Sequence, residues 1–282
     1  MEKTDFIFRC LASGSSGNCY YLGTFEKGIL IDAGISARTI NHLLKDMGMD
    51  FSKIMGVLVT HDHADHIRAV GTIGEKVHIP IYATSLIHQG IDRNYGVSVK
   101  LRTSRAYYEK GVPFELAGMT INTFGISHDS TDCVGYTIDF MGERFMIATD
   151  CGETSPELAE AIRTSNHIVI EANHDEDMLL NGPYPTYLKQ RILSPRGHQS
   201  NMVCGEMLAE NFHEGIRHVF LCHLSEENND PELALKTVSE YLESAGADLI
   251  HTIAPGEAVP EGKTYLHALD RLSPSPIFKF NK

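Results

Sequence analysis

The chain has 282 residues, of which 42% are hydrophobic and 22% charged, and its formal net charge at pH 7 is −13. These proportions are typical of a globular protein with a packed core, and the acidic excess argues against a uniformly cationic nucleic-acid-binding surface. No stretch approaches about 18 consecutive apolar residues, so no segment is expected to span a membrane. Residues 1–5 lack the basic start and apolar run of a secretory signal.

Short apolar runs separated by polar or glycine-rich turns dominate the first third of the chain and predict strands. The expected strands are residues 6–11, 19–22, 28–32, 55–60 and 77–83. A turn at residues 13–18 makes a hairpin of the first two strands. Two helices are expected, at residues 37–47 and 67–73, and Gly48 closes the first of them.

From residue 119 onward, expected strands alternate with expected helices. The strands are residues 119–124, 135–140, 144–148, 167–172, 218–222 and 249–253. The helices are residues 156–164, 203–211 and 231–245. No repeat, low-complexity tract or flexible linker interrupts this order. We therefore expect a single domain over residues 1–282 with a layered α/β architecture.

The six cysteines are scattered along the chain without a Cys-x-x-Cys pair. That pattern favours reduced thiols over a framework of disulfides. Together with the missing secretory signal, it predicts a cytoplasmic location.

A cluster of histidines and acids follows the expected strand at residues 55–60. It contains His61, His63, Asp65 and His66, and borderline divalent metals prefer such nitrogen and carboxylate ligands. In an extended segment, positions i and i+2 point the same way, so His61 and His63 can reach one ion. The turn that follows can carry Asp65 and His66 toward a second ion. The alternative is a polar loop that happens to be rich in histidine.

Further candidate ligands occur near the ends of other expected strands, where loops on a rigid scaffold carry function. These residues are Asp32, His128, Asp150 and His223. Their repeated placement after apolar strands favours a metal site over a chance cluster.

In this order, the residues resemble the five motifs of the metallo-β-lactamase superfamily. The resemblance implies a four-layer αβ/βα sandwich of two mixed sheets flanked by helices, with two divalent ions. It implies that one ion binds His61, His63 and His128, that the other binds Asp65, His66 and His223, and that Asp150 bridges them. Asp32 then fits the carboxylate that braces the metal loop.

A narrower resemblance, to the bacterial YycJ/WalJ subfamily, lies in four further segments. They are residues 11–18, 171–175, 188–193 and 223–229. That subfamily is associated with exonuclease activity on DNA in the 5′ to 3′ direction. Residues 197–200, Gly-His-Gln-Ser, also resemble a Gly-His-Ser segment of tRNase Z enzymes. The interval between Asp150 and His223 is too short for the domain inserted in β-CASP nucleases, and no long glycine-rich arm is evident.

We expect catalytic roles for Asp65, Asp32 and His198. Asp32 would orient a ligand histidine, and His198 would be the general acid for the departing alkoxide. For Asp32 the alternative is a carboxylate that caps a turn, and for His198 it is a surface histidine that caps a helix. The expected substrate-binding residues are Ser15, Asn18, His174, Lys189, Arg191 and Arg196.

DNA is the expected partner, because residues 178–201 contain Lys189, Arg191 and Arg196 but no acid. Lys189 and Arg191 could equally form only a solvated helix face. The favoured function is a dinuclear phosphodiesterase, a DNA exonuclease. Open alternatives are a hydrolase of a small cyclic phosphodiester, thioester or lactone, and a metal-bound regulatory or redox module. Zinc is the first choice of metal, with manganese or iron as alternatives, and the sequence does not fix the oligomeric state.

Overall fold

The computed structural model describes residues 5–254 and 257–280. The described chain forms two compact units. The first contains the residues up to 122, residues 130–134 and those from 270 onward, and the second contains residues 123–129 and 135–269. The expectation of a single domain stays a prediction. Among the described helices, none combines the length and the apolar character that crossing a bilayer requires.

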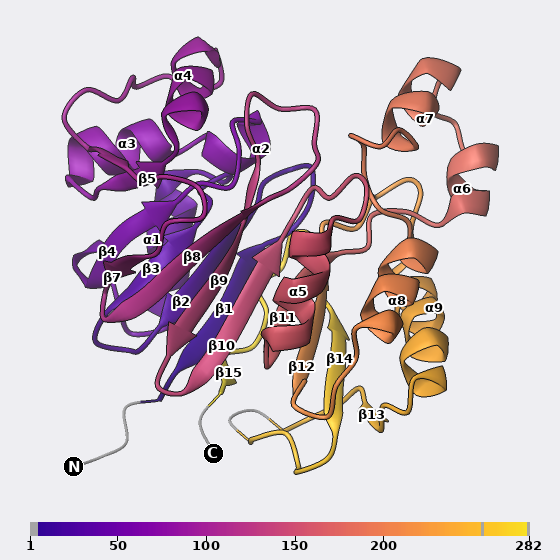
Figure 1. Ribbon diagram of the computed structural model, residues 1–282. Coiled ribbons are helices and arrows are strands. Elements are labelled where there is room, and N and C mark those ends of the chain that lie inside the picture. Colours follow the sequence, from indigo (N-terminus) through magenta and orange to yellow (C-terminus); the bar gives the residue numbers. More distant parts are fainter. Residues whose placement is uncertain (1–4, 255–256, 281–282) are drawn as a thin grey trace. The chain divides into compact units, whose positions relative to one another are not determined.

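The first sheet has seven strands in the order β15-β1-β2-β3-β4-β5-β6 (Figure 1). Its strands are β1 (Ile7–Ala12), β2 (Cys19–Gly23), β3 (Gly28–Ile31), β4 (Ile54–Leu58), β5 (Ile81–Ala83), β6 (Arg105–Tyr107) and β15 (Phe278–Lys279). Pairing is antiparallel from β15 to β3 and parallel from β3 to β6, so the sheet is mixed. The chain between these strands forms α1 (Ala37–Asp46), the 3-10 turn η1 (Phe51–Lys53), α2 (Ala64–Ile67), α3 (Val70–Val77) and α4 (Ser85–Arg93).

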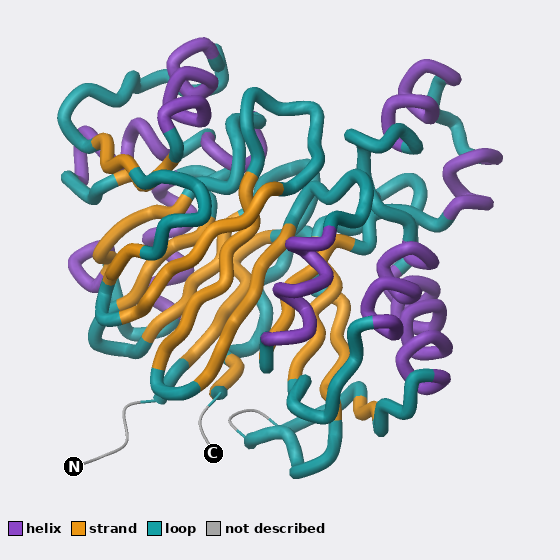
Figure 2. Tube along the Cα trace, viewed as in Figure 1, coloured by secondary structure: helices purple, strands orange, loops and turns teal. Residues whose placement is uncertain are grey.

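The second sheet has eight strands in the order β13-β14-β12-β11-β10-β9-β8-β7. Its strands are β7 (Phe114–Leu116), β8 (Met119–Gly125), β9 (Val134–Phe140), β10 (Glu143–Ala148), β11 (His167–Glu171), β12 (His218–Cys222), β13 (Leu249–Ile250) and β14 (Thr264–Ala268). Strands β10, β11, β12, β14 and β13 run parallel, while β9 pairs antiparallel with β10. The helices are α5 (Pro156–Thr164), α6 (Glu176–Asn181), α7 (Thr186–Ile192), α8 (Asn201–Glu210) and α9 (Pro231–Ser244), and Figure 2 shows them along the trace.

Each unit has its own core. In the first, Phe8 stacks on Tyr20, Phe278 and Phe280 with ring centroids 6.2–6.3 Å apart. In the second, the buried aliphatic side chains of β10, β11 and β12 pack against those of α5, α8 and α9. The central strands of both sheets are buried along their whole length, which explains why they read as continuous apolar runs in the sequence.

Local sequence explains the helix boundaries. Helix α9 begins where Asp230 accepts hydrogen bonds from the second and third helical N–H groups and Pro231 occupies the first helical position. Its buried residues, Ala234, Val238 and Leu242, recur every four positions, so one face packs inward. The following Gly246, at φ 93°, ends the helix in the left-handed region.

The predicted two mixed sheets with flanking helices are confirmed. The helix expected at residues 67–73 is instead two helices, α2 and α3, and α3 runs on to Val77. The strand expected at residues 77–83 therefore shrinks to β5, because His78 caps α3 with φ 66°. The strand expected at residues 249–253 is reduced to β13. Elements α4, α6, α7, β6, β7, β14 and β15 had no counterpart in the prediction.

A candidate metal centre in two halves

In the first unit, the histidine cluster follows β4 and enters α2. The ring centroids of His61 and His63 are 4.7 Å apart, and those of His61 and His66 are 4.1 Å apart. His66 is fully buried, and its Nε2 lies 3.6 Å from Oδ2 of Asp65. The start of α2 places Asp65 and His66 in its first turn. We call His61, His63, Asp65 and His66 the first half-site.

Asp32 follows β3 and is the main support of this half-site. Its fully buried carboxylate accepts hydrogen bonds from the Thr60 N–H at 2.8 Å, from the Thr60 hydroxyl at 2.8 Å and from Nδ1 of His66 at 2.7 Å. Burial raises the pKa of Asp32, although the contacts with His66 and Thr60 act in the opposite direction. Asp32 therefore orients the His66 ring from behind, as a carboxylate behind a ligand histidine does.

The second unit gathers candidate ligands from the ends of several strands. Oδ1 of Asp150 lies 3.7 Å from Nε2 of His128, 3.5 Å from Nδ1 of His223 and 3.6 Å from Nδ1 of His198. His128 follows β8, Asp150 follows β10 and His223 directly follows β12. We call His128, Asp150 and His223 the second half-site.

Glu171, the last residue of β11, joins this group although the sequence analysis gave it no role. Its Oε1 accepts hydrogen bonds from Nδ1 of His223 at 2.7 Å and from Nδ1 of His198 at 2.8 Å. Its Oε2 accepts from the N–H groups of Cys151 at 2.8 Å and Gln199 at 3.2 Å. The available signal was its position, a carboxylate at the end of an apolar strand, as for Asp32. One buried carboxylate thus fixes two imidazoles.

The contact between His198 and Glu171 shifts the pKa values of both groups. Burial by itself would lower the pKa of His198, but the carboxylates of Glu171 and Asp150 outweigh it and raise that pKa above its ordinary value. Burial by itself would raise the pKa of Glu171, yet His198 and the hydrogen bond from His223 bring it below its ordinary value. The pair favours a protonated ring beside an ionised carboxylate.

The ring orientations test whether a metal fits these residues. In four candidate ligand histidines, Nδ1 is hydrogen-bonded within its own unit, which leaves Nε2 as the nitrogen for an ion. In His66, the Asn18 amide also donates to Nε2 at 3.0 Å, and an ion there would replace that hydrogen bond. The partners of Nδ1 are the Thr60 hydroxyl for His61, Asp32 for His66, the Gly197 carbonyl for His128 and Glu171 for His223. Such partners are the usual companions of metal-bound histidine, and the imidazole and carboxylate donors suit zinc, manganese or iron. The residues present therefore fit divalent ions in both half-sites.

The expected substrate-binding residues lie in different settings. Ser15 is exposed, whereas Asn18 is buried and donates from Nδ2 to Nε2 of His66 at 3.0 Å. His174 is buried, and neither of its ring nitrogens has a hydrogen-bond partner in the described part of the chain. Burial lowers the pKa of His174 to about 4, so the ring is neutral at pH 7.

The three basic residues expected to bind substrate contact the protein itself. The ammonium group of Lys189 donates to the carbonyls of Leu180 at 2.7 Å and Gly182 at 2.8 Å. Arg191 forms a two-pronged ion pair with Asp129 at 2.5 and 3.0 Å. Arg196 donates twice to the carbonyl of His128, at 2.8 and 3.0 Å. These cations brace α6, α7 and the segment that carries His128.

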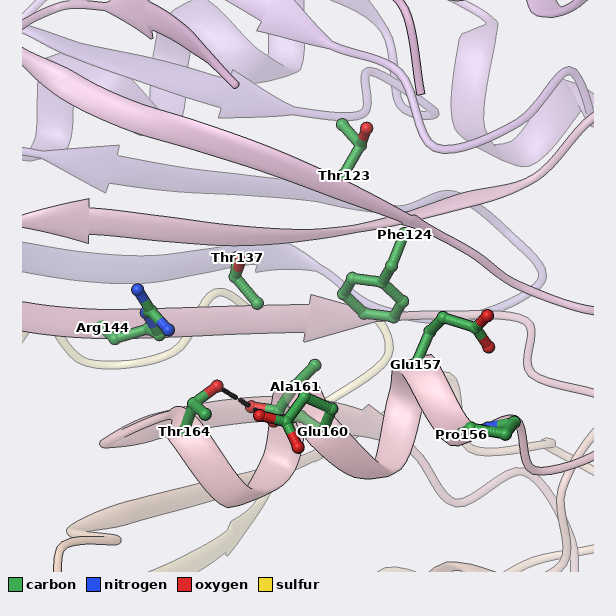
Figure 3. Close-up of a pocket in the computed structure, with 9 residues that line it drawn as sticks. All are labelled: Thr123, Phe124, Thr137, Arg144, Pro156, Glu157, Glu160, Ala161 and Thr164. Atoms are coloured by element: carbon green, nitrogen blue, oxygen red, sulfur yellow. Dashed lines mark hydrogen bonds between the residues drawn. The ribbon is translucent and has the colours of Figure 1, made fainter. Parts of the chain in front are cut away.

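A separate hollow of about 430 Å³ lies between α5 and strands β8–β10 of the second unit (Figure 3). Its lining combines Arg144 with the acids Glu157 and Glu160, and it includes none of the candidate ligands. Arg144 is paired with Asp139 at 2.6 Å. The metal chemistry therefore belongs to the half-sites and not to this hollow.

Known proteins resemble the chain over most of its length. The sequence model of the beta-lactamase superfamily domain matches residues 27–224. The exodeoxyribonuclease YycJ of Bacillus anthracis is 35% identical over 240 residues, which cover 85% of this chain and 90% of that protein. The exodeoxyribonuclease WalJ of Streptococcus pneumoniae is 34% identical over 265 residues, covering 92% and 98%. The metallo-β-lactamase-fold protein YhfI of Bacillus subtilis has a TM-score of 0.67 at 14% identity, covering 98% of this chain and 100% of that one.

Proposed function

The chain belongs to the metallo-β-lactamase superfamily, and from this premise we propose that its two half-sites together bind two divalent ions and hydrolyse DNA phosphodiesters. It is a metallo-hydrolase related to the YycJ and WalJ exodeoxyribonucleases. The observation that carries the proposal is the similarity to these relatives over 85–92% of the chain. The direction we propose is 5′ to 3′.

We propose His61, His63 and His128 as ligands of one ion, Asp65, His66 and His223 as ligands of the other, and Asp150 as the shared ligand. The hydrogen bonds that orient Nδ1 of His61, His66, His128 and His223 support this assignment, because metal-bound histidines usually have such a partner behind the ring. Zinc is the metal we favour. Two bound ions would supply a hydroxide at neutral pH and offset charge on the phosphoryl oxygens.

In this proposal, two carboxylates orient the histidine rings and one histidine transfers a proton. Asp32 holds the ring of His66, and Glu171 holds the rings of His223 and His198. With Nδ1 of His198 bound to Glu171, its Nε2 is the atom that would donate a proton to the departing alkoxide. The raised pKa of His198 supports this role, because a general acid must be protonated at working pH.

The alternative in the same fold is a small substrate, such as a cyclic phosphodiester, a thioester or a lactone. The net charge of −13 favours it, since a long polyanion is repelled by an acidic surface. Measuring which substrates are hydrolysed distinguishes the DNA nuclease from the small-substrate hydrolase. Metal-loaded protein would be incubated with DNA labelled at either end, with bis-p-nitrophenyl phosphate and with a thioester.

We expect release of mononucleotides from the 5′ end of DNA and turnover of bis-p-nitrophenyl phosphate. The variants His61→Ala and Asp65→Ala should lose turnover and bound metal, because each loses a proposed ligand. His42→Ala, at an exposed histidine of α1, is the control and should retain both. Hydrolysis of the thioester alone, or full activity in the ligand variants, would overturn the proposal.

A further inference from the structure

The turn between β1 and β2, residues 13–18, has a fixed shape and an exposed tip. Ser15 and Ser16 are exposed, while the residues on either side of them are buried. The N–H of Gly17 donates to the carbonyl of Gly14 at 2.8 Å and closes the turn. Gly17 has φ 153°, and a Cβ there would lie 2.6 Å from a neighbouring side-chain carbon. The turn therefore presents two hydroxyl groups in a defined position.

The same turn is joined to the first half-site through Asn18. The Asn18 N–H donates to the carbonyl of Asp65 at 2.7 Å, and its side-chain amide donates to Nε2 of His66 at 3.0 Å. Gly34 completes the junction, because its N–H donates to the carbonyl of Asn18 and a Cβ on it would lie 1.6 Å from the carbonyl of Asp65. The turn that carries Ser15 and Ser16 is therefore hydrogen-bonded, through Asn18, to the segment that carries two proposed metal ligands.

Two arginines from distant parts of the chain converge on this turn. Arg68, directly after α2, places a guanidinium nitrogen 3.3 Å from the carbonyl of Ser16. Arg271, after β14, places one 3.5 Å from the Ser16 hydroxyl, and its side chain lies against Gly14. Both contacts are long for hydrogen bonds. Arg68 is exposed, and within the described residues it forms no ion pair with a carboxylate.

This setting differs from that of the basic segment in the second unit. There, Lys189 donates to two carbonyls and Arg191 is held by Asp129. An acidic protein that binds a polyanion needs local cationic groups that are not already neutralised. Arg68 meets that requirement, and it does so next to hydroxyl groups.

We propose that Arg68, Arg271 and the hydroxyls of Ser15 and Ser16 form a phosphate-binding subsite beside the first half-site. It would take a phosphate of the substrate strand that flanks the bond being cleaved. A guanidinium group matches two phosphate oxygens at once, and serine hydroxyls donate to phosphate. The inference rests on the proposed function, because a flanking phosphate requires a nucleic-acid substrate. The phosphate is either an internal phosphodiester or a terminal 5′-phosphate.

Binding of a short fluorescent single strand of DNA with phosphorothioate linkages tests the subsite in the metal-loaded, full-length protein. Kd would be measured over a range of salt concentrations for strands with and without a 5′-phosphate. The variants are Arg68→Gln and Arg271→Gln. The control is Lys27→Gln, an exposed cation in the turn at the opposite end of β2.

Each arginine variant should raise Kd about five-fold at about 0.1 M salt. The plot of log Kd against log salt concentration should become less steep by about 0.7, which corresponds to the loss of one phosphate contact. If only the phosphorylated strand loses affinity, the subsite holds the terminal phosphate, and equal loss for both strands identifies an internal one. Wild-type affinity and slope in Arg68→Gln would overturn the inference, as would an equal loss in Lys27→Gln.

Hydrolysis by the unaltered protein separates this inference from the proposed function. If wild-type protein degrades DNA but the arginine variants bind it normally, only the subsite is wrong. If wild-type protein hydrolyses no phosphodiester but binds the strand through Arg68 and Arg271, the subsite stands and the nuclease function is wrong.

Discussion

Glu171→Gln removes one charge from the second unit and changes the shape of the side chain very little. The carboxylate accepts four hydrogen bonds, two through Oε1 from the rings of His198 and His223 and two through Oε2 from the N–H groups of Cys151 and Gln199. A glutamine amide has a single acceptor oxygen, and its NH2 group must face one of these pairs. Two hydrogen bonds are therefore lost whichever way the amide turns.

The expected loss of activity follows from the role of these hydrogen bonds, which orient the rings of His198 and His223. A hydrogen bond to a charged group contributes about 1.5–3 kcal/mol, and removing the partner of a metal-bound histidine lowers metal affinity or activity about 10–100-fold. We expect Glu171→Gln to lower kcat in that range and to lower bound metal, because His223 loses its orientation. KM should change little, since the Glu171 side chain is fully buried and its Oε1 contacts the two rings.

The assay is steady-state hydrolysis of bis-p-nitrophenyl phosphate, with bound metal measured by mass spectrometry on the same preparations. Glu171→Asp should recover part of the lost kcat, because it restores the charge at a shorter reach. Glu206→Gln, at an exposed position of α8, is the matched control. Wild-type kcat and metal content in Glu171→Gln would refute the idea that this carboxylate positions the two rings.

Three other outcomes are expected. His198→Ala should lower kcat about 100-fold without loss of metal, and loss of metal would instead identify His198 as a ligand. Lowering the pH from 7 to 5 should reduce the free energy of unfolding by about 2 kcal/mol through the titration of His167. Burial lowers the pKa of His167 to about 3, so as pH falls below about 6.5 only the unfolded chain takes up this proton. Urea unfolding of His167→Gln should show a correspondingly smaller loss, and an equal loss would contradict this. Gly17→Ala should destabilise the fold by about 1–3 kcal/mol because of its φ of 153°, and an unchanged melting temperature would show that the turn can relax.

The sequence predicted the fold class and the chemical character of the site because both are encoded locally. Buried strands are continuous apolar runs, and candidate ligands lie within three residues of their ends, as His61 follows β4 and His223 follows β12. Helix boundaries with a clear cap, such as Asp230 and Pro231 at the start of α9, were also found. The boundary between α3 and β5 was missed, because it depends on His78 adopting a left-handed conformation that its residue type does not signal.

What the sequence could not supply were contacts between residues far apart in the chain. Glu171 and His198 are separated by 27 positions, and Arg271 lies 255 positions from Ser16. The composition of residues 178–201 correctly showed a basic segment, but it could not show that Arg191 is neutralised by Asp129. Charge counts identify cations, and only tertiary structure shows which of them are already engaged.

Asp32, Asp150 and His223 all adopt a left-handed backbone conformation, which is unfavourable for residues with a side chain. Their φ angles are 58°, 52° and 54°, a region that costs side-chain-bearing residues about 1–2 kcal/mol each and costs glycine almost nothing. Glycine at these positions would relieve that strain, but it would also remove a buried hydrogen-bonding side chain such as the Asp32 carboxylate, which holds Thr60 and His66. Engineering of this protein for thermal stability therefore requires that the activity of each variant at these positions be measured as well.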